Sequence, residues 1–158
     1  MSEISLEISE NFHDTNPVIV SILNGAFVFT ADIIRAIDID CEVDFIKVSS
    51  YRGMNSTGAI KMSKDLSIDI KNRRVIIVED IIDSGLSIKY LYEHIIKYKP
   101  ENITIVSLLA KTNNYKLNFN IDIIGFELSS EFVVGYGLDF NQRFRNLKSI
   151  FKLHSPSR

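Results

Sequence analysis

Three runs of almost continuously apolar, largely β-branched residues most constrain how this chain folds. They read VIVSIL at 18–23, VIIV at 75–78 and ITIVSLL at 103–109. A strand with one face in water alternates polar and apolar residues, whereas a strand buried on both faces is apolar almost throughout. Strands of the second kind belong to parallel sheets that helices cover on each side.

Helical patterns lie between these runs, as a parallel sheet requires. The clearest follows the second run, where apolar residues recur at i, i+3, i+4, i+7 and i+8: Ile88, Leu91, Tyr92, Ile95 and Ile96. Residues 26–37 place apolar side chains near one helical face as well. The alternation of strands and helices predicts an α/β fold with a largely parallel central sheet flanked by helices.

The rest of the chain divides into shorter elements within one domain. Further strands are expected at 41–51, 121–126 and 132–138. Apolar residues alternate again over 66–70, whereas 52–63 is interpreted as a long polar loop and the tail from 141 is weakly patterned. The chain has 158 residues, no internal repeat and no Pro/Gly-rich linker, so a single domain over 1–158 is expected.

The composition excludes several classes of protein. The net charge of −2 gives no general attraction for nucleic acid or for an anionic membrane. A single cysteine, Cys41, excludes an internal disulfide and a cysteine-cluster metal site. The acidic N-terminus lacks the basic start and apolar run of a secretory signal, and no apolar stretch is long enough for a membrane span. A cytoplasmic protein without nucleic-acid or membrane partners is therefore expected.

The end of the second apolar run carries the most informative polar residues. Glu79 and Asp80 follow that run directly, Asp83 comes three residues later, and residues 84–87 (SGLS) open the next helix. Backbone N–H groups at a helix start attract phosphate, and carboxylates accept hydrogen bonds from ribose hydroxyls or bind Mg²⁺. The pattern favours a ribose-phosphate site. Solvated acids beside a plain N-cap Ser84 would fit the same spacing.

The segment VIIVEDIIDSGLS, residues 75–87, resembles the phosphoribosyl-pyrophosphate (PRPP) signature of the type I phosphoribosyltransferases. Its ED-I-I-D-[ST]-G form is that of the purine-salvage branch, the hypoxanthine-guanine phosphoribosyltransferases. Other segments resemble, in the family's order, its first loop and helix, its flexible catalytic loop, its lysine segment and its base-stacking segment: 22–37, 48–61, 106–112 and 125–147. The resemblance covers about residues 17–150.

The resemblance implies a fold and a reaction. The expected fold has a core at about 17–125 and a small hood at about 126–158, joined by the N-terminal residues; the short N-terminus implies a reduced hood. The expected reaction transfers the 5-phosphoribosyl group from PRPP to hypoxanthine, and also to guanine, giving IMP or GMP and pyrophosphate. Mg²⁺ is the implied cofactor, and a homodimer or homotetramer is the implied assembly.

The resemblance also assigns roles to individual residues. Asp83 would be the general acid/base at purine N7. The 5′-phosphate and ribose would be held by Glu79, Asp80, Asp83, Ser84, Gly85, Leu86 and Ser87. The purine would be held by Lys111 at O6, Phe132 by stacking, the Val133 backbone, and Asp139. The pyrophosphate and the lid over it would involve Asn24, Gly25, Ser50, Tyr51 and Arg145. Metal ligands would be Glu79, Asp80 and Asp139.

One departure from the family pattern and two alternatives accompany this interpretation. Asn24 stands where the family often has lysine, in a loop expected to carry a cis peptide between Leu23 and Asn24. A transferase for another base, such as xanthine or a pyrimidine, and a PRPP-binding regulator are the alternatives. A Rossmann dehydrogenase and a P-loop NTPase are excluded because their glycine motifs are missing.

Overall fold

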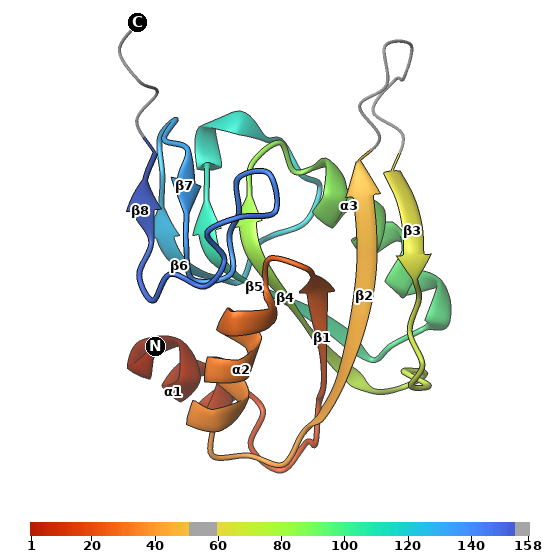
Figure 1. Ribbon diagram of the computed structural model, residues 1–158. Coiled ribbons are helices and arrows are strands. Elements are labelled where there is room, and N and C mark those ends of the chain that lie inside the picture. The colour runs from red at the N-terminus through yellow and green to blue at the C-terminus, as the bar shows by residue number, and fades with distance from the viewer. Residues whose placement is uncertain (51–59, 154–158) are drawn as a thin grey trace, which may run out of the picture.

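A six-stranded sheet forms the centre of the molecule (Figure 1), in a computed structural model that describes residues 1–50 and 60–153. Its strand order is β3-β2-β1-β4-β5-β6, and only β3 runs antiparallel to its neighbour. The strands are β1 (Val18–Leu23), β2 (Glu42–Ser50), β3 (Ile60–Lys64), β4 (Arg74–Ile82), β5 (Asn102–Ala110) and β6 (Ile123–Glu127). The predicted largely parallel α/β fold is confirmed.

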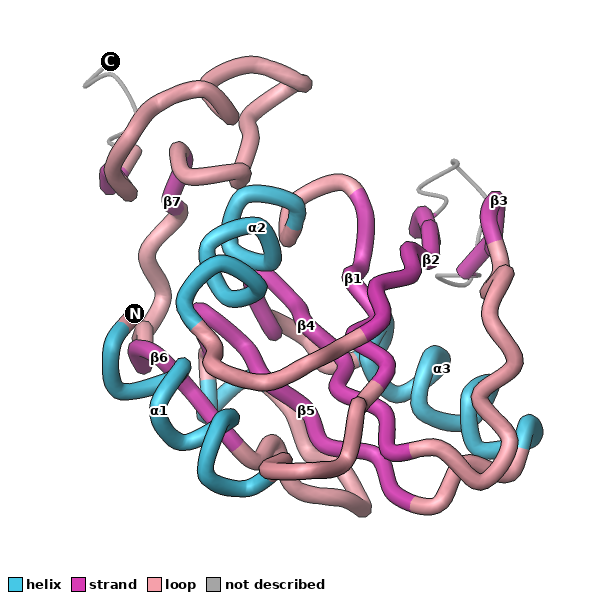
Figure 2. The backbone as a smooth tube through the Cα atoms, turned by 90° about the horizontal axis from the view of Figure 1, so that it is seen from below, coloured by secondary structure: helices cyan, strands magenta, loops and turns pink. Residues whose placement is uncertain are grey.

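Helices cover both faces of this sheet (Figure 2). On one face lie α1 (Ser2–Asn11) and α2 (Phe27–Ala36), and on the other lies α3 (Leu86–Ile95), followed by the short 3-10 turn η1 (Ile96–Tyr98). Ile76 and Val78 of β4 pack in the first core, whereas Val75 and Ile77 pack in the second. Both sets are fully buried, which explains why the run is apolar at every position.

The C-terminal part forms a small hood beside β6 (Figure 1). It contains a two-stranded antiparallel sheet of β7 (Val133–Val134) and β8 (Phe151–Lys152). The predicted strand over 132–138 is wrong beyond these first residues, because Gly135, Tyr136 and Gly137 all have positive φ, which ends the extended conformation. Gly135 and Leu138 instead exchange backbone hydrogen bonds across a tight turn.

Three other local features differ from what the sequence pattern indicates. The N-terminal helix α1 was missed, although Ile4, Ile8 and Phe12 recur every four residues and are buried. Helix α1 packs in one core with the sheet strands and with Val133 and Leu138 of the hood, so its assignment to the hood stays a prediction. Residues 60–63 of the predicted loop belong to β3. Residues 66–70 form no strand, and the alternation there reflects Leu66, Ile68 and Ile70 packing on the second core from an irregular segment. Within the described parts of the chain, no helix is long and apolar enough to cross a membrane.

Asp44 of β2 holds that irregular segment against the sheet. Its side chain is almost fully buried and accepts hydrogen bonds from the backbone N–H groups of Ser67 at 2.5 Å and Ile68 at 2.9 Å. Lys64 Nζ donates to it at 3.1 Å. Burial alone would raise the pKa of Asp44, but these donors outweigh that effect and lower it. The ionised carboxylate is therefore the form that the fold stabilises.

The substitution Asp44→Asn is expected to lower the free energy of unfolding by about 3–5 kcal/mol at pH 7, because it breaks a buried ion pair and turns an amide N–H₂ toward donors. A carboxyl with a lowered folded pKa contributes stability above its unfolded pKa and loses it as the pH falls. The difference from wild type should therefore shrink below about pH 4. Urea unfolding at pH 7 and pH 3 measures both. The exposed Asp69→Asn is the control; an equal loss at both pH values would contradict the prediction.

Candidate active site

The site lies at the carboxyl ends of the parallel strands, where the strand order reverses. From β1 the chain moves outward through β2 to β3, and then returns to β4 on the other side of β1. The helices that follow β1 and β4 cover opposite faces, so a crevice opens between the two strand ends, as is general for open parallel sheets. The loop after β1, the end of β4 and the segment after β5 all meet there.

Two neighbouring acids occupy the end of β4. Glu79 is 8% exposed, and within the described chain its Oε2 atom is buried without a hydrogen-bond partner. Burial and the charge of Asp80 raise the pKa of Glu79 well above its usual range. Burial also raises the pKa of Asp80, to about 6. Hydrogen bonds from backbone N–H groups and the charge of the Arg145 guanidinium act in the opposite direction but are weaker than the effect of burial. Because β4 extends to Ile82, both acids lie within the strand rather than after it.

A buried carboxylate oxygen without a partner fits a ligand that supplies a donor or a cation. Ribose hydroxyls and Mg²⁺ both meet that requirement. The residues of the described ranges contain no group of three acidic, histidine or cysteine side chains at metal-binding spacing. The carboxylates therefore fit a Mg²⁺ ion that completes its shell with phosphate oxygens and water, as Mg²⁺ commonly does.

The turn between β4 and α3 forms a small cradle. A cavity of about 100 Å³ is lined by Glu79, Ile81, Ile82, Asp83, Ser84, Gly85, Ser87 and Ile88. The N-cap of α3 is Gly85, with φ +74°, where a Cβ would lie 2.9 Å from the Tyr115 side chain. Ser84 is therefore not the N-cap, although its Oγ accepts a long hydrogen bond of 3.5 Å from the Leu86 N–H at the start of α3. Backbone N–H groups at such a helix start can bind an anion.

Asp83 and Lys111 meet although they follow different strands. Lys111 Nζ donates to Asp83 Oδ2 at 3.0 Å, and Asn114 Nδ2 donates to Asp83 Oδ1 at 2.9 Å. The Lys111 side chain is 9% exposed, whereas that of Asp83 is 56% exposed. The structure thus presents a carboxylate and an ammonium side by side at the crevice. Sequence reasoning missed Asn114, which lies in a 3-10 turn, η2 (Thr112–Asn114), and belongs to no recognisable motif.

The loop after β1 packs directly on the acids of β4. The predicted cis peptide between Leu23 and Asn24 is confirmed. A Cβ at Gly25 would overlap the Asp80 carboxylate, and a Cβ at Gly137 of the hood would overlap the Gly25 carbonyl oxygen. The hood therefore contacts the loop after β1 at Gly137, and that loop contacts Asp80 at Gly25. Both contacts are close enough to require glycine.

The hood contains four further residues predicted for the site. Arg145 Nη2 pairs with Asp139 Oδ1 at 2.6 Å, and both charges act on the pKa of Asp80. Phe132 is 48% exposed, and Phe140 packs edge-on against it at 5.7 Å between ring centroids. Val133 is buried and pairs with Lys152. Ser50 ends β2, its side chain is outside the described part of the structure, and Tyr51 lies outside the described residues altogether.

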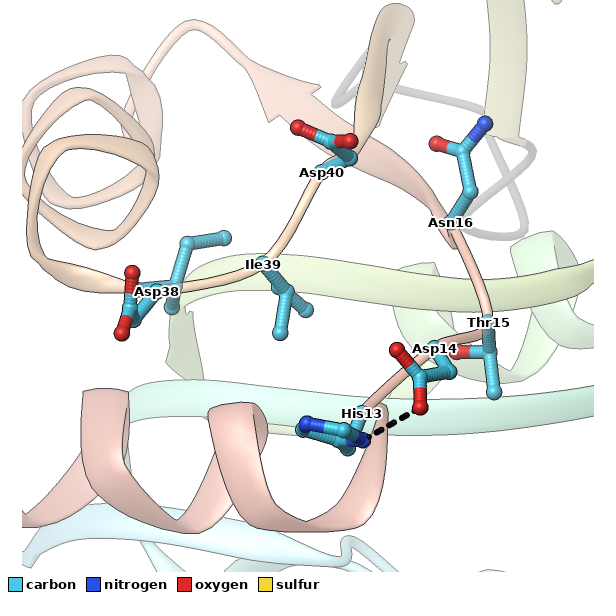
Figure 3. A pocket seen from close by; sticks show the side chains of 8 residues that line it. His13, Asp14, Thr15, Asn16, Asp38, Ile39 and Asp40 are labelled. Atoms are coloured by element: carbon cyan, nitrogen blue, oxygen red, sulfur yellow. Dashed lines mark ion pairs between the residues drawn. The ribbon is translucent and has the colours of Figure 1, made fainter.

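A larger cavity of about 540 Å³ lies at the other end of the sheet, before β1 and β2 (Figure 3). Its lining includes Asp14, Asp38 and Asp40, and His13 turns toward Asp14 at 2.8 Å. These side chains belong to the loops at the amino ends of parallel strands, the end at which such sheets do not bind ligands. No residue predicted for the site lines this cavity.

Comparison with known proteins agrees with this geometry. The model of the phosphoribosyl transferase domain matches residues 1–141, so the chain belongs to the phosphoribosyl transferase family. The hypoxanthine-guanine phosphoribosyltransferase of Aquifex aeolicus is 40% identical over 153 residues, which cover 96% of this chain and 86% of that protein. The enzyme of that name from Bacillus subtilis is 43% identical over 151 residues, covering 95% and 84%. Within the family, the chain therefore belongs to the hypoxanthine-guanine phosphoribosyltransferases, as the sequence analysis predicts.

Solved structures give the same result. A crystal structure of a hypoxanthine-guanine phosphoribosyltransferase from Bacillus anthracis matches with a TM-score of 0.90 and 39% identity. The match covers 97% of this chain and 91% of that one. A hypoxanthine phosphoribosyltransferase from Staphylococcus aureus matches with a TM-score of 0.90 and 37% identity, covering 97% and 84%. The predicted type I phosphoribosyltransferase fold is confirmed.

Proposed function

We propose that the protein transfers the 5-phosphoribosyl group of PRPP to hypoxanthine, and also to guanine, forming IMP or GMP and releasing pyrophosphate. The pairing of Lys111 with Asp83 at the crevice is the observation that carries this proposal. Family membership supports the enzyme class, a pentosyltransferase of purine salvage. The assembly as a homodimer or homotetramer and the cytoplasmic location belong to the same proposal.

The Lys111–Asp83 pair matches one edge of a 6-oxopurine. O6 and N7 lie side by side on that edge, and O6 accepts hydrogen bonds, whereas adenine presents a donating amino group at the same position. Lys111 would donate to O6, with protons to spare beside its contact to Asp83. An adenine amino group would oppose the ammonium, so the pair selects the 6-oxo group.

Asp83 would move the proton of the reaction. Purine N9 forms the new bond to C1 of the ribose while the bond from C1 to the pyrophosphate oxygen breaks. A base bound with a proton on N7 loses that proton, and the Asp83 carboxylate would accept it. General acid/base groups of this kind typically contribute about 10²–10⁴ in rate.

The 5′-phosphate and the pyrophosphate of PRPP would lie on opposite sides of Glu79 and Asp80. The start of α3, with the backbone of Gly85 and Leu86 and the hydroxyls of Ser84 and Ser87, would hold the 5′-phosphate. Asn24, Gly25 and Arg145 would hold the pyrophosphate, where a planar guanidinium suits two oxygens at once. Ser50 and Tyr51 would form part of a lid over this end.

Glu79 and Asp80 would bind the ribose hydroxyls, directly or through a Mg²⁺ ion, and Asp139 would bind a second Mg²⁺ ion. When bound, Mg²⁺ neutralises charge that develops on the departing pyrophosphate. The purine ring would lie on Phe132, which is half exposed and kept edge-on by Phe140, with the Val133 backbone at its rim. In this proposal the core, 17–125, supplies most groups for PRPP together with Lys111 and Asp83 for the base, whereas the hood, 126–158, supplies Phe132 and Val133 for the base and Arg145 for the pyrophosphate.

The test is product formation from PRPP and Mg²⁺ with five bases: hypoxanthine, guanine, xanthine, adenine and uracil. We expect turnover of hypoxanthine and guanine but not of adenine, because only the 6-oxo group accepts from Lys111. Turnover of xanthine or uracil alone would instead establish a transferase for another base. A folded protein that binds PRPP and turns over no base would refute the enzyme and favour the regulator.

A further inference from the structure

A tie between the hood and α2 lies apart from the residues predicted to touch substrates. The Tyr136 hydroxyl donates to Asp32 Oδ2 at 2.5 Å, across 104 positions of the sequence. Burial and this hydrogen bond raise the pKa of the Tyr136 phenol, so the hydroxyl keeps its proton at neutral pH. A short bond to a carboxylate is among the stronger hydrogen bonds of a protein.

The backbone at Tyr136 has an unfavourable conformation. Its φ of +53° lies in the left-handed region, between Gly135 at +96° and Gly137 at +99°. Bulky residues seldom adopt such values, because Cβ approaches the backbone closely. The Tyr136 N–H donates to the Leu147 carbonyl at 2.8 Å and helps to hold this conformation. Strain that the surrounding contacts maintain points to a needed side-chain position.

The next residue transmits that position to Arg145. The Gly137 N–H donates to the Arg145 carbonyl at 3.1 Å, and Arg145 Nη1 donates back to the Gly137 carbonyl at 2.7 Å. The same guanidinium pairs with Asp139. The direction in which the Arg145 guanidinium points therefore depends on where Gly137 lies.

Gly137 also contacts the loop after β1, which lies opposite Arg145 at the proposed pyrophosphate end of the site. Its Cα lies so close to the Gly25 carbonyl oxygen that any Cβ would overlap it. Helix α2, which carries Asp32, begins at Phe27, directly after this loop. The hydrogen bond from Tyr136 to Asp32 thus joins the two segments that would flank a pyrophosphate group.

We propose that Tyr136 and Asp32 are positioning residues, which hold the 137–145 segment against the loop after β1 and so set the pyrophosphate end of the site. The inference rests on the proposed function and deepens it. The pair acts through Gly137, Gly25 and Arg145. The Lys111–Asp83 side of the purine end is held by other contacts, since the Lys111 N–H donates to the Ile82 carbonyl at 2.9 Å and Lys111 Nζ to Asp83.

The test compares Tyr136→Phe with Tyr98→Phe. Tyr98 also donates its hydroxyl to an aspartate, Asp65, at 3.0 Å, but on the C-terminal side of α3, away from the site. We expect Tyr136→Phe to raise the KM for PRPP about tenfold, as the loss of one hydrogen bond to a charged group implies, while the KM for hypoxanthine changes less than about twofold. Tyr98→Phe should change neither constant. Calorimetric titration with inorganic pyrophosphate gives the same comparison without turnover.

Variants of Asp32 complete the test. Asp32→Asn keeps an acceptor oxygen but loses the charge and should fall between wild type and Asp32→Ala, which should match Tyr136→Phe, and the double variant should lose no more than either alone. Additive losses, equal rises in both KM values, or an unchanged PRPP KM in Tyr136→Phe would overturn the proposal. A wild-type protein that turns over no base would refute the proposed function instead, and the pyrophosphate affinities would still test the pair.

Discussion

Asp83→Asn is expected to lower kcat for IMP formation by about 10²–10⁴, the contribution of a positioned general acid/base. Asparagine has nearly the same shape and can still accept a hydrogen bond from Lys111, but it cannot take a proton from purine N7. The Asp83 side chain is more than half exposed, so the fold should not depend on its charge. Steady-state kinetics with saturating PRPP and hypoxanthine measure the loss.

Asp38→Asn is the matched control for this experiment. Asp38 is exposed at the opposite end of the sheet, on the rim of the large cavity there (Figure 3). Its removal should leave kcat unchanged. If Asp83→Asn turned over at the wild-type rate, Asp83 would not be the proton acceptor. If it lost its thermal transition, the loss of activity would report folding rather than chemistry.

Lys111→Met is expected to lower kcat/KM for hypoxanthine by about 10–100-fold, the value of one charge-assisted hydrogen bond. Methionine matches the length of lysine and suits the buried position, where 9% of the side chain is exposed, but it donates no hydrogen bond. Any residual kcat/KM for adenine, which competition detects even when turnover is negligible, should not fall to the same extent, because the adenine amino group accepts no hydrogen bond from the ammonium. The ratio of kcat/KM values for hypoxanthine and adenine should therefore fall.

The exposed Lys116→Met controls for the loss of a positive charge near the site. This substitution should leave the kcat/KM values for both bases unchanged, because the effect of a distant, solvent-exposed charge is strongly screened. An unchanged ratio in Lys111→Met, with both bases reduced equally, would mean that Lys111 supports Asp83 without reading the base. Competition between the two bases in one reaction measures the ratio directly.

Much of the core was predictable because local pattern and tertiary burial agree there. The run at 75–78 is apolar at each position since neighbours on both faces exclude water, and the acids that follow it are the exception. The strand order and the pairing of Lys111 with Asp83 were not predicted. The parallel sheet brings the ends of β4 and β5 together, although 28 positions separate the two side chains.

The hood was much less predictable. Residues 132–138 have the apolar character of a strand, but successive positive φ values turn the chain, and only the glycines hint at them. The bond from Tyr136 to Asp32 spans 104 positions and follows no periodicity. Asn114 belongs to a polar turn whose sequence would suit any solvated loop. The roles of the site residues therefore remain predictions, which the variants above test.

The reversal of strand order at β1 and β4 makes the two substrate specificities separable in evolution. Most groups proposed to meet the sugar and phosphates come from the loop after β1, the end of β4 and the start of α3, with Arg145 added from the hood, whereas Lys111 and Phe132 come from the segment after β5 and from the hood. Changes in the second group can alter the acceptor base without rebuilding the donor half. A chain of this design can exchange one nucleobase for another by replacing a few loop residues, while its buried sheet stays constant.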